Sequence, residues 1–470
     1  MASLTYAEAA HLLRRAGFGG PPQEINQLVA LGRENAVDLL VDYELVNNKE
    51  FDKALGRGFN VKRPSPLEMQ SLWVARMMLT RRPFEEKMTL FWHNHFATSY
   101  TKVFFSLMHV QNNVLRQHAV DRFDTLLLKV SQDAAMLIWL DGITNVVGSP
   151  NENFARELQE LFTMGINDEV TGEPNYTEKD VKEIARAFTG WKFKLKKQDV
   201  FKPAFLFIPS QHDSTAKEIY GQTASFTGED VITVICARRA TGRHLVKRFF
   251  EFFVYPLADS PEDKATIEKF ADVYFARDHS VKELARAIFA SDEFFSERAR
   301  FGLVKNPAEL LVGAARMLGA GYSLQGRETA DFFSLFFLNQ MGMELFNPPN
   351  VSGWALHARW LMTSTLLQRF NFAGFLADSR PSVPPLRGPT ISDEVVRGLA
   401  APTAAGTVEN MLSRLGPLEV DDEAKRILSD YLQTDDQGNR IEFMVNDETL
   451  RKYVRGLLHM VLCMQEFQLN

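Results

Sequence analysis

Cysteine is scarce in this sequence: Cys236 and Cys463 are the two cysteines among 470 residues. Both lie in apolar stretches with helical periodicity, and neither has the close cysteine spacing of a zinc site. A cysteine-rich metal site and a disulfide-stapled fold are therefore excluded. We expect two buried free thiols, and a single bridge between them is the alternative.

Long apolar runs are missing too. No stretch approaches the ~20 apolar residues that a helix needs to cross a bilayer, so no membrane span is expected. Residues 1–6 also lack the basic segment and apolar core of a signal peptide. The sequence as written therefore predicts a cytoplasmic protein, and an exported or periplasmic one if a leader has been removed.

Neither sign of charge dominates. The chain has 53 lysines and arginines and 59 aspartates and glutamates, which gives a formal charge of −6. Nucleic acids are bound largely by neutralising their phosphates, so no nucleic-acid partner is expected, although a local basic patch remains open. A nucleophile elbow, a kinase motif set and a phosphate-binding glycine loop are absent as well. The sequence carries no signal for the oligomeric state.

Helical periodicity is what the sequence has in abundance, and it predicts a mainly α protein, a globular array of many helices. Hydrophobic residues make up 45% of the chain and charged residues 24%, which excludes wholesale disorder. Thr177 and Asp180 have the spacing of a capping box and predict a helix start. The other predicted helices cover 7–15, 23–45, 66–81, 83–95, 104–131, 150–164, 229–254, 261–276, 280–298, 305–319, 327–343 and 357–376.

The helical period stops between Trp191 and Phe226. Strand-like pieces at 191–195 and 204–208 predict a small β-hairpin inserted near 191–226. Residues 377–389 are proline-rich and predict a linker. We therefore expect a main helical domain over 1–376 that carries the hairpin, followed by a C-terminal helical segment, 390–470, packed on it.

Two histidines end the segment from Pro83 to Phe96. His95 continues the apolar stripe of the predicted helix and is expected to point into the core. His93 lies two residues away, about 200° around a helix, and faces elsewhere. The pair converges on one metal ion only if the helix ends near Trp92. The spacing alone favours the alternative, a hydrogen-bonded core histidine beside a surface one.

Carboxylates mark a second segment, which begins as a predicted helix. Ser149 is placed to be the N-cap and Pro150 to be the first helical residue. Glu152 is placed to be the acid of a capping box. Glu152 and Arg156 share one flank. Glu157 falls on the apolar face and needs a partner, because an unpaired buried charge is costly. An arginine is the commoner partner, whereas a histidine or a metal would make Glu157 a functional acid. The arginines expected nearby are Arg116, Arg156 and Arg186.

His212 and Asp213 follow the predicted hairpin as a pair. A loop histidine beside an acid can bind a metal or act as a general base. Equally, both can be turn residues, with Asp213 capping a helix over 214–220. The sequence leaves these two interpretations open.

A stiff loop at 348–354 carries two prolines, a glycine and a tryptophan. Asn350 and Trp354, with Arg156, are candidates for a ligand platform on which a sugar could stack. The alternative, favoured on general grounds, is a tryptophan packed under a rigid loop.

These segments together resemble the bacterial family catalogued as domain of unknown function 1800. The resemblance implies no activity, because the family is named for lacking an assigned one. It does imply a partner, since many members carry export signals and are encoded beside proteins resembling alkaline-phosphatase-type hydrolases. This chain departs from the pattern at residues 355–357, where relatives usually have small residues. The matching stretches are 12–19, 86–96, 133–137, 151–162, 176–181, 185–191, 212–213 and 348–354.

Three functional hypotheses follow. The first is a metal-dependent hydrolase, in which His93, His95 and His212 bind zinc or a similar divalent metal. The acids and bases of that hydrolase would be Glu152, Glu157 and Asp213. The second is a non-catalytic binding or scaffold protein that acts with a partner hydrolase. The third is a carbohydrate-binding or carbohydrate-cleaving protein, with Glu152 and Glu157 as paired acids and Trp354 as the platform.

Overall fold

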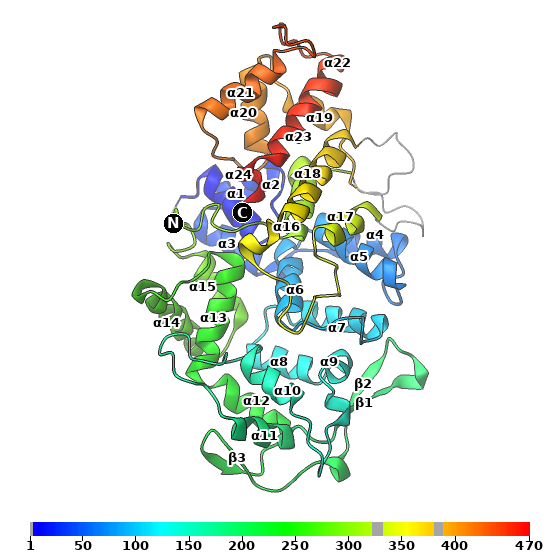
Figure 1. Cartoon of the computed structure of the whole chain (residues 1–470), viewed down its shortest axis with the longest axis vertical. Coiled ribbons are helices and arrows are strands. Elements are labelled where there is room, and N and C mark those ends of the chain that lie inside the picture. The colour runs from blue at the N-terminus through cyan, green and yellow to red at the C-terminus, as the bar shows by residue number, and fades with distance from the viewer. Residues whose placement is uncertain (1–2, 322–331, 380–388) are drawn as a thin grey trace.

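Helices account for most of the regular structure in the computed structural model, which describes residues 3–321, 332–379 and 389–470 (Figure 1). This confirms the mainly α prediction. The helices before the strands are α1 (Tyr6–Arg15), α2 (Pro22–Leu31), α3 (Arg33–Val41), α4 (Lys49–Gly58), α5 (Pro66–Leu79), α6 (Pro83–His95), α7 (Phe105–Gln117), α8 (Phe123–Ser131), α9 (Ala134–Trp139), α10 (Asn153–Glu160) and α11 (Glu178–Ala187).

The helices that follow the strands complete the body and form one end of the molecule (Figure 1). They are α12 (Gly228–Cys236), α13 (Arg239–Phe253), α14 (Pro261–Ala276), α15 (Val281–Phe289), α16 (Pro307–Leu318), α17 (Phe332–Gln340), α18 (Thr363–Asp378), α19 (Asp393–Leu399), α20 (Ala404–Arg414), α21 (Asp422–Leu432), α22 (Asp447–Thr449), α23 (Arg455–Cys463) and α24 (Gln465–Gln468). No helix among the described residues is long and apolar enough to cross a membrane.

Side-chain hydrogen bonds confirm one predicted helix start and explain why another is wrong. The Thr177 hydroxyl accepts the Asp180 N–H, and the Asp180 carboxylate accepts the Thr177 N–H, so the predicted capping box is confirmed. The start predicted at Ser149 is wrong, because α10 begins only at Asn153. The side-chain oxygen of Asn145 accepts the N–H of Asn151 at 3.0 Å, which ties the preceding residues into a loop.

Some predicted helices divide, and others run beyond the described residues. The stretch 23–45 breaks at Gly32, which has φ 75° and joins α2 to α3. The stretch 104–131 breaks between α7 and α8, where the Phe123 N–H donates to the His279 carbonyl. Residues 327–331 of the predicted helix 327–343, and 380–388 of the predicted linker, lie outside the described residues.

The predicted insertion holds two hairpins, not one. Strands β1 (Trp191–Leu195) and β2 (Pro203–Phe207) pair antiparallel, close to the predicted bounds. Strands β3 (Lys217–Ile219) and β4 (Gln222–Ala224) form a second antiparallel pair. Three-residue strands are too short to show a clear alternation of polar and apolar residues, which explains why the second hairpin was missed.

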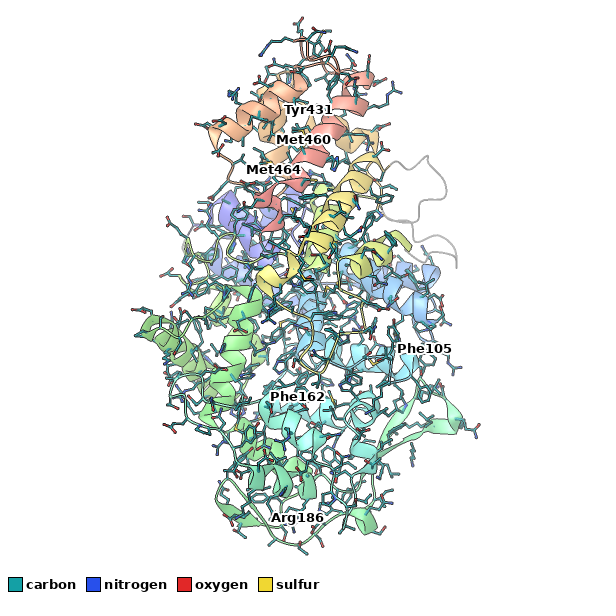
Figure 2. The ribbon with its side chains drawn as sticks, in the orientation of Figure 1. Phe105, Phe162, Arg186, Tyr431, Met460 and Met464 are labelled. Carbon is teal, nitrogen blue, oxygen red and sulfur yellow. The ribbon has the colours of Figure 1, made fainter. Side chains whose placement is uncertain are left out.

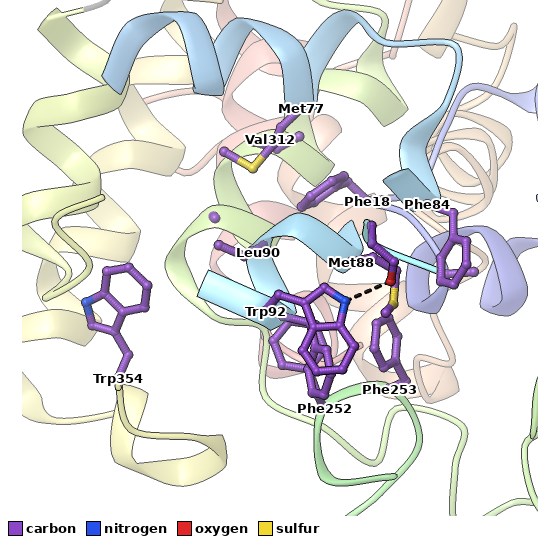
Figure 3. Packing of buried hydrophobic residues seen from close by; sticks show 14 of the residues in the cluster. Phe18, Met77, Phe84, Met88, Leu90, Trp92, Phe252, Phe253, Val312 and Trp354 are labelled. Carbon is purple, nitrogen blue, oxygen red and sulfur yellow. Dashed lines mark hydrogen bonds between the residues drawn. The ribbon is translucent and has the colours of Figure 1, made fainter. Parts of the chain in front are cut away.

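α6 runs through the centre of the hydrophobic core. Met88 and Trp92 of this helix and Phe252 and Phe253 of α13 belong to one hydrophobic cluster (Figure 3), and all four side chains are buried. The Trp92 indole donates to the Ala119 carbonyl at 2.7 Å, so its polar atom is satisfied inside the core. Both cysteines are free thiols: Cys236 is buried, as expected, whereas Cys463 is half-buried.

Candidate functional site

The C-terminal end of α6 carries the two candidate histidines. The helix continues through His95, and the Phe96 N–H donates to the Trp92 carbonyl, so it does not stop near Trp92. His95 is 4% exposed, and its Nε2 lies 3.1 Å from the Phe162 carbonyl oxygen. Burial holds the pKa of His95 well below its ordinary value. The expected core histidine with a satisfied hydrogen bond is therefore confirmed.

His93 is not a surface residue, and that part of the prediction is wrong. Its side chain is 1% exposed and lies among three aromatic rings, those of Trp73, Phe346 and Trp354, at centroid distances of 5.3, 5.4 and 5.4 Å. Burial lowers the pKa of His93 to about 3, so its imidazole is neutral at physiological pH. Because α6 persists, His93 and His95 contact different neighbours.

Asn94 fastens the loop at 348–354 onto α6. Its side-chain oxygen accepts the Trp354 N–H at 2.7 Å, and Gly353 packs directly against it. Trp354 is 4% exposed, as the packed-tryptophan alternative requires, and Asn350 accepts the Ser352 N–H within the loop. We call this contact between α6 and the loop the first junction.

The residues after α6 extend the first junction. The Tyr100 N–H donates to the Phe346 carbonyl at 3.1 Å. The Ser99 hydroxyl donates to the side-chain oxygen of Asn347 at 2.5 Å, and the Tyr100 hydroxyl donates to Glu344. Two segments that lie far apart in the sequence are thus held together by side chains of both.

His212 and Asp213 form a second junction, with the end of α11. His212 Nδ1 donates to the Thr189 carbonyl at 2.9 Å, and the Asp213 N–H donates to the Thr189 hydroxyl at 2.8 Å. Arg186 donates to Asp213 at 2.8 Å, and this hydrogen bond holds the pKa of Asp213 well below its ordinary value. The helix that Asp213 was expected to cap does not form, because β3 begins at Lys217.

α10 and α11 meet at a third junction. The Arg156 guanidinium makes two hydrogen bonds of 2.8 Å to Glu178, and it lies 3.7 Å from Glu152. Glu157 is half-buried, and its pKa is raised by burial and by the nearby Glu160 carboxylate.

The expected arginine partner of Glu157 is missing among the described residues. Arg116 instead pairs with Glu86, Arg156 with Glu178, and Arg186 with Asp213. Within those same residues no group of three or more histidines, cysteines, aspartates or glutamates could hold a metal ion.

The hydrogen bonds of His95 and His212 lie apart in the molecule. Phe162, which accepts from His95, is near the middle of the body in Figure 2, whereas Arg186, the partner of Asp213, lies at the end opposite Tyr431 and Met460. The structure therefore does not bring His95 and His212 together.

A family model described as "Protein of unknown function (DUF1800)" matches residues 11–469, which includes all three junctions. The chain belongs to this family. No curated protein and no solved structure matches it.

A buried ion pair beside the first junction was not predicted from the sequence. Arg116 of α7 donates to both carboxylate oxygens of Glu86, at 2.7 and 3.0 Å, and the Trp73 indole donates to the same carboxylate at 3.1 Å. Trp73 in turn lies against His93. The one sequence signal was a charged residue within an apolar helix, which does not reveal its partner.

We expect Asp213→Asn to cost this DUF1800 protein about 1–2 kcal/mol of unfolding free energy at neutral pH. Because the folded-state pKa of Asp213 lies below the ordinary 3.8, its pairing with Arg186 contributes stability above that pH. The contribution is lost as the pH falls through the folded-state pKa. Urea denaturation above and below pH 3.8 should therefore show a weaker acid sensitivity in the variant.

The matched variant for this prediction is Arg186→Gln, which removes the partner and leaves the carboxylate. It should also reduce the acid sensitivity. If Asp213→Asn keeps the full pH dependence of the natural chain, the ion pair does not stabilise the second junction.

Proposed function

We propose that this chain is a non-catalytic binding protein that acts with a partner. The observation that carries the proposal is that His95, His212 and Asp213 already hold segments of the chain together, at two separate places. A zinc site needs several ligand atoms at about 2.0–2.3 Å from one ion. Imidazoles held at two separate places in the molecule are poorly placed to meet that requirement.

The carbohydrate hypothesis receives less support. Stacking on a sugar needs an accessible aromatic face, whereas Trp354 is buried against His93. Glu152 lies 3.7 Å from Arg156, which is the geometry of an ion pair. In the binding scheme a partner of the alkaline-phosphatase-like type, which the family resemblance implies, carries out the chemistry.

Thermal unfolding with and without added zinc tests the proposal. Protein purified without chelator is compared as the natural chain, as His212→Ala, and as His459→Ala. The side chain of His459 is exposed, and its helix α23 lies away from α6, α10 and α11 (Figure 1). We expect zinc to leave all three midpoints unchanged, and His212→Ala to unfold earlier because it loses a hydrogen bond. A zinc-dependent rise in the natural chain and in His459→Ala that is absent from His212→Ala would contradict the proposal.

A further inference from the structure

The hairpin of β1 and β2 lies at one side of the molecule (Figure 1). Its connecting loop, Lys196 to Lys202, is made of two consecutive turns. The Asp199 N–H donates to the Lys196 carbonyl at 2.9 Å, and the Lys202 N–H donates to the Asp199 carbonyl at 3.0 Å. A third bond, from the Lys196 N–H to the Lys202 carbonyl, closes the loop. The loop therefore has a defined conformation.

The first of these turns has an unusual sequence for its backbone. Lys197 and Gln198 have φ values of 50° and 58°, in the left-handed region that favours glycine and asparagine. Two long polar side chains therefore stand at positions where glycine or asparagine would make the turn more stable.

Two adjoining hollows, of about 620 and 380 Å³, lie where this loop meets residues 61–63 and α7. Arg63, Phe201 and Lys202 line both, so the two hollows are neighbours, and we call them together the basic groove. The positively charged residues of its lining are Lys62, Arg63, Lys196, Lys197 and Lys202.

A single carboxylate, that of Asp199, lines the basic groove, and it is already engaged. Arg63 donates to it at 2.6 Å, and Lys202 lies 3.6 Å away. Among the described residues, no carboxylate lies within ion-pair distance of Lys62, Lys196 or Lys197, and all three side chains are exposed. This local positive charge stands out on a chain whose formal charge is −6.

Apolar side chains lie among these lysines. Val200, in the lining, is 40% exposed, and Leu195 at the end of β1 is 37% exposed. The ring of Phe201 meets Phe105 and His109 edge-on, so it belongs to the groove wall.

We propose that the basic groove binds an extended acidic segment of a partner protein. Its lysines supply the complementary charge, and the exposed Val200 in its lining can contact an apolar side chain of such a segment. A nucleic acid fits less well, because Phe105 and His109 contact the ring of Phe201 and limit the face on which a base could stack. The inference rests on the binding function proposed above and adds the chemistry of the partner.

Fluorescence anisotropy of the full chain with a labelled peptide of alternating glutamate and valine tests the groove. The groove variant combines Lys62→Gln, Lys196→Gln and Lys197→Asn, and asparagine suits the left-handed turn at 197. The control variant, Lys49→Gln, Lys129→Gln and Lys182→Gln, removes the same charge from exposed lysines outside the groove. We expect the groove variant to bind the peptide about tenfold more weakly.

The control should bind as the natural chain does, and added salt should weaken the peptide complex. The groove variant should keep the natural thermal midpoint, which excludes misfolding as the cause. The proposal is overturned if the glutamine–valine peptide binds equally well, if both triple variants bind alike, or if a single-stranded oligonucleotide or a vesicle of anionic phospholipid binds more tightly than the peptide.

The two proposals can fail separately. If the chain binds zinc and also binds the peptide through these lysines, the non-catalytic assignment is wrong and the proposal for the groove stands. If zinc has no effect and the lysines do not affect peptide binding, the proposal for the groove is wrong and the non-catalytic assignment stands.

Discussion

Gly353→Ala is expected to lower the free energy of unfolding by about 3 kcal/mol, because it separates the two segments of the first junction. A Cβ atom at this position would lie 2.3 Å from the side-chain oxygen of Asn94 and 2.4 Å from its carbonyl oxygen. The side chain of Asn94 could rotate away, but the carbonyl belongs to α6 and cannot. Gly353 also has φ 82°, which adds backbone strain for any residue with a Cβ.

Gly148→Ala is the matched control for this substitution. Gly148 has the same φ of 82°, and nothing lies within 4 Å of a Cβ there. It therefore reports the backbone strain alone, about 1–2 kcal/mol. Urea denaturation of both variants gives the difference, which is the cost of the clash with Asn94. Equal losses in the two variants would mean that the loop does not pack on Asn94 as described.

Arg116→Met is expected to cost about 3–5 kcal/mol, since it leaves the buried Glu86 carboxylate without its cation. The Glu86 side chain is 1% exposed, and that of Arg116 is 10% exposed, so water cannot replace the lost guanidinium. The Trp73 indole would remain as a hydrogen-bond donor to Glu86, and one neutral donor does not compensate a charge. The effect should reach the first junction, because Trp73 packs on His93.

The double variant Glu86→Gln, Arg116→Met separates charge from packing. It removes the unpaired carboxylate and keeps an amide oxygen for the Trp73 indole, so we expect it to recover most of the lost stability. Denaturant unfolding of the single and double variants measures the coupling. A double variant as unstable as the sum of its single changes would show that the two charges do not interact.

Sequence patterns predicted the parts of the fold that depend on interactions between residues close together in the chain. The apolar stripe and Pro83 predicted the bounds of α6, and the loss of the helical period with a strand-like piece at 191–195 predicted β1. The start of α10 was missed because Asn145, outside the helix, holds the residues before it. That hydrogen bond belongs to the tertiary structure and leaves no periodic pattern.

In the candidate site, too, local features were predicted and contacts between distant residues were not. The inward orientation of His95 follows from helical geometry and was predicted. The bond between Asn94 and Trp354 joins residues 260 positions apart and has no sequence signal. Glu157 was expected to take an arginine, but Arg156 is turned toward Glu178 across the third junction. The basic groove likewise depends on Arg63 and Asp199 meeting across 136 positions.

We propose that His95 and His212 hold segments of the chain together and do not coordinate an ion. Metal content per chain tests it most directly, measured on protein purified without chelator from a zinc-supplemented culture. We expect far less than one ion per chain, unchanged in His93→Ala and His212→Ala. One ion per chain in the natural protein, lost in both variants, would contradict it.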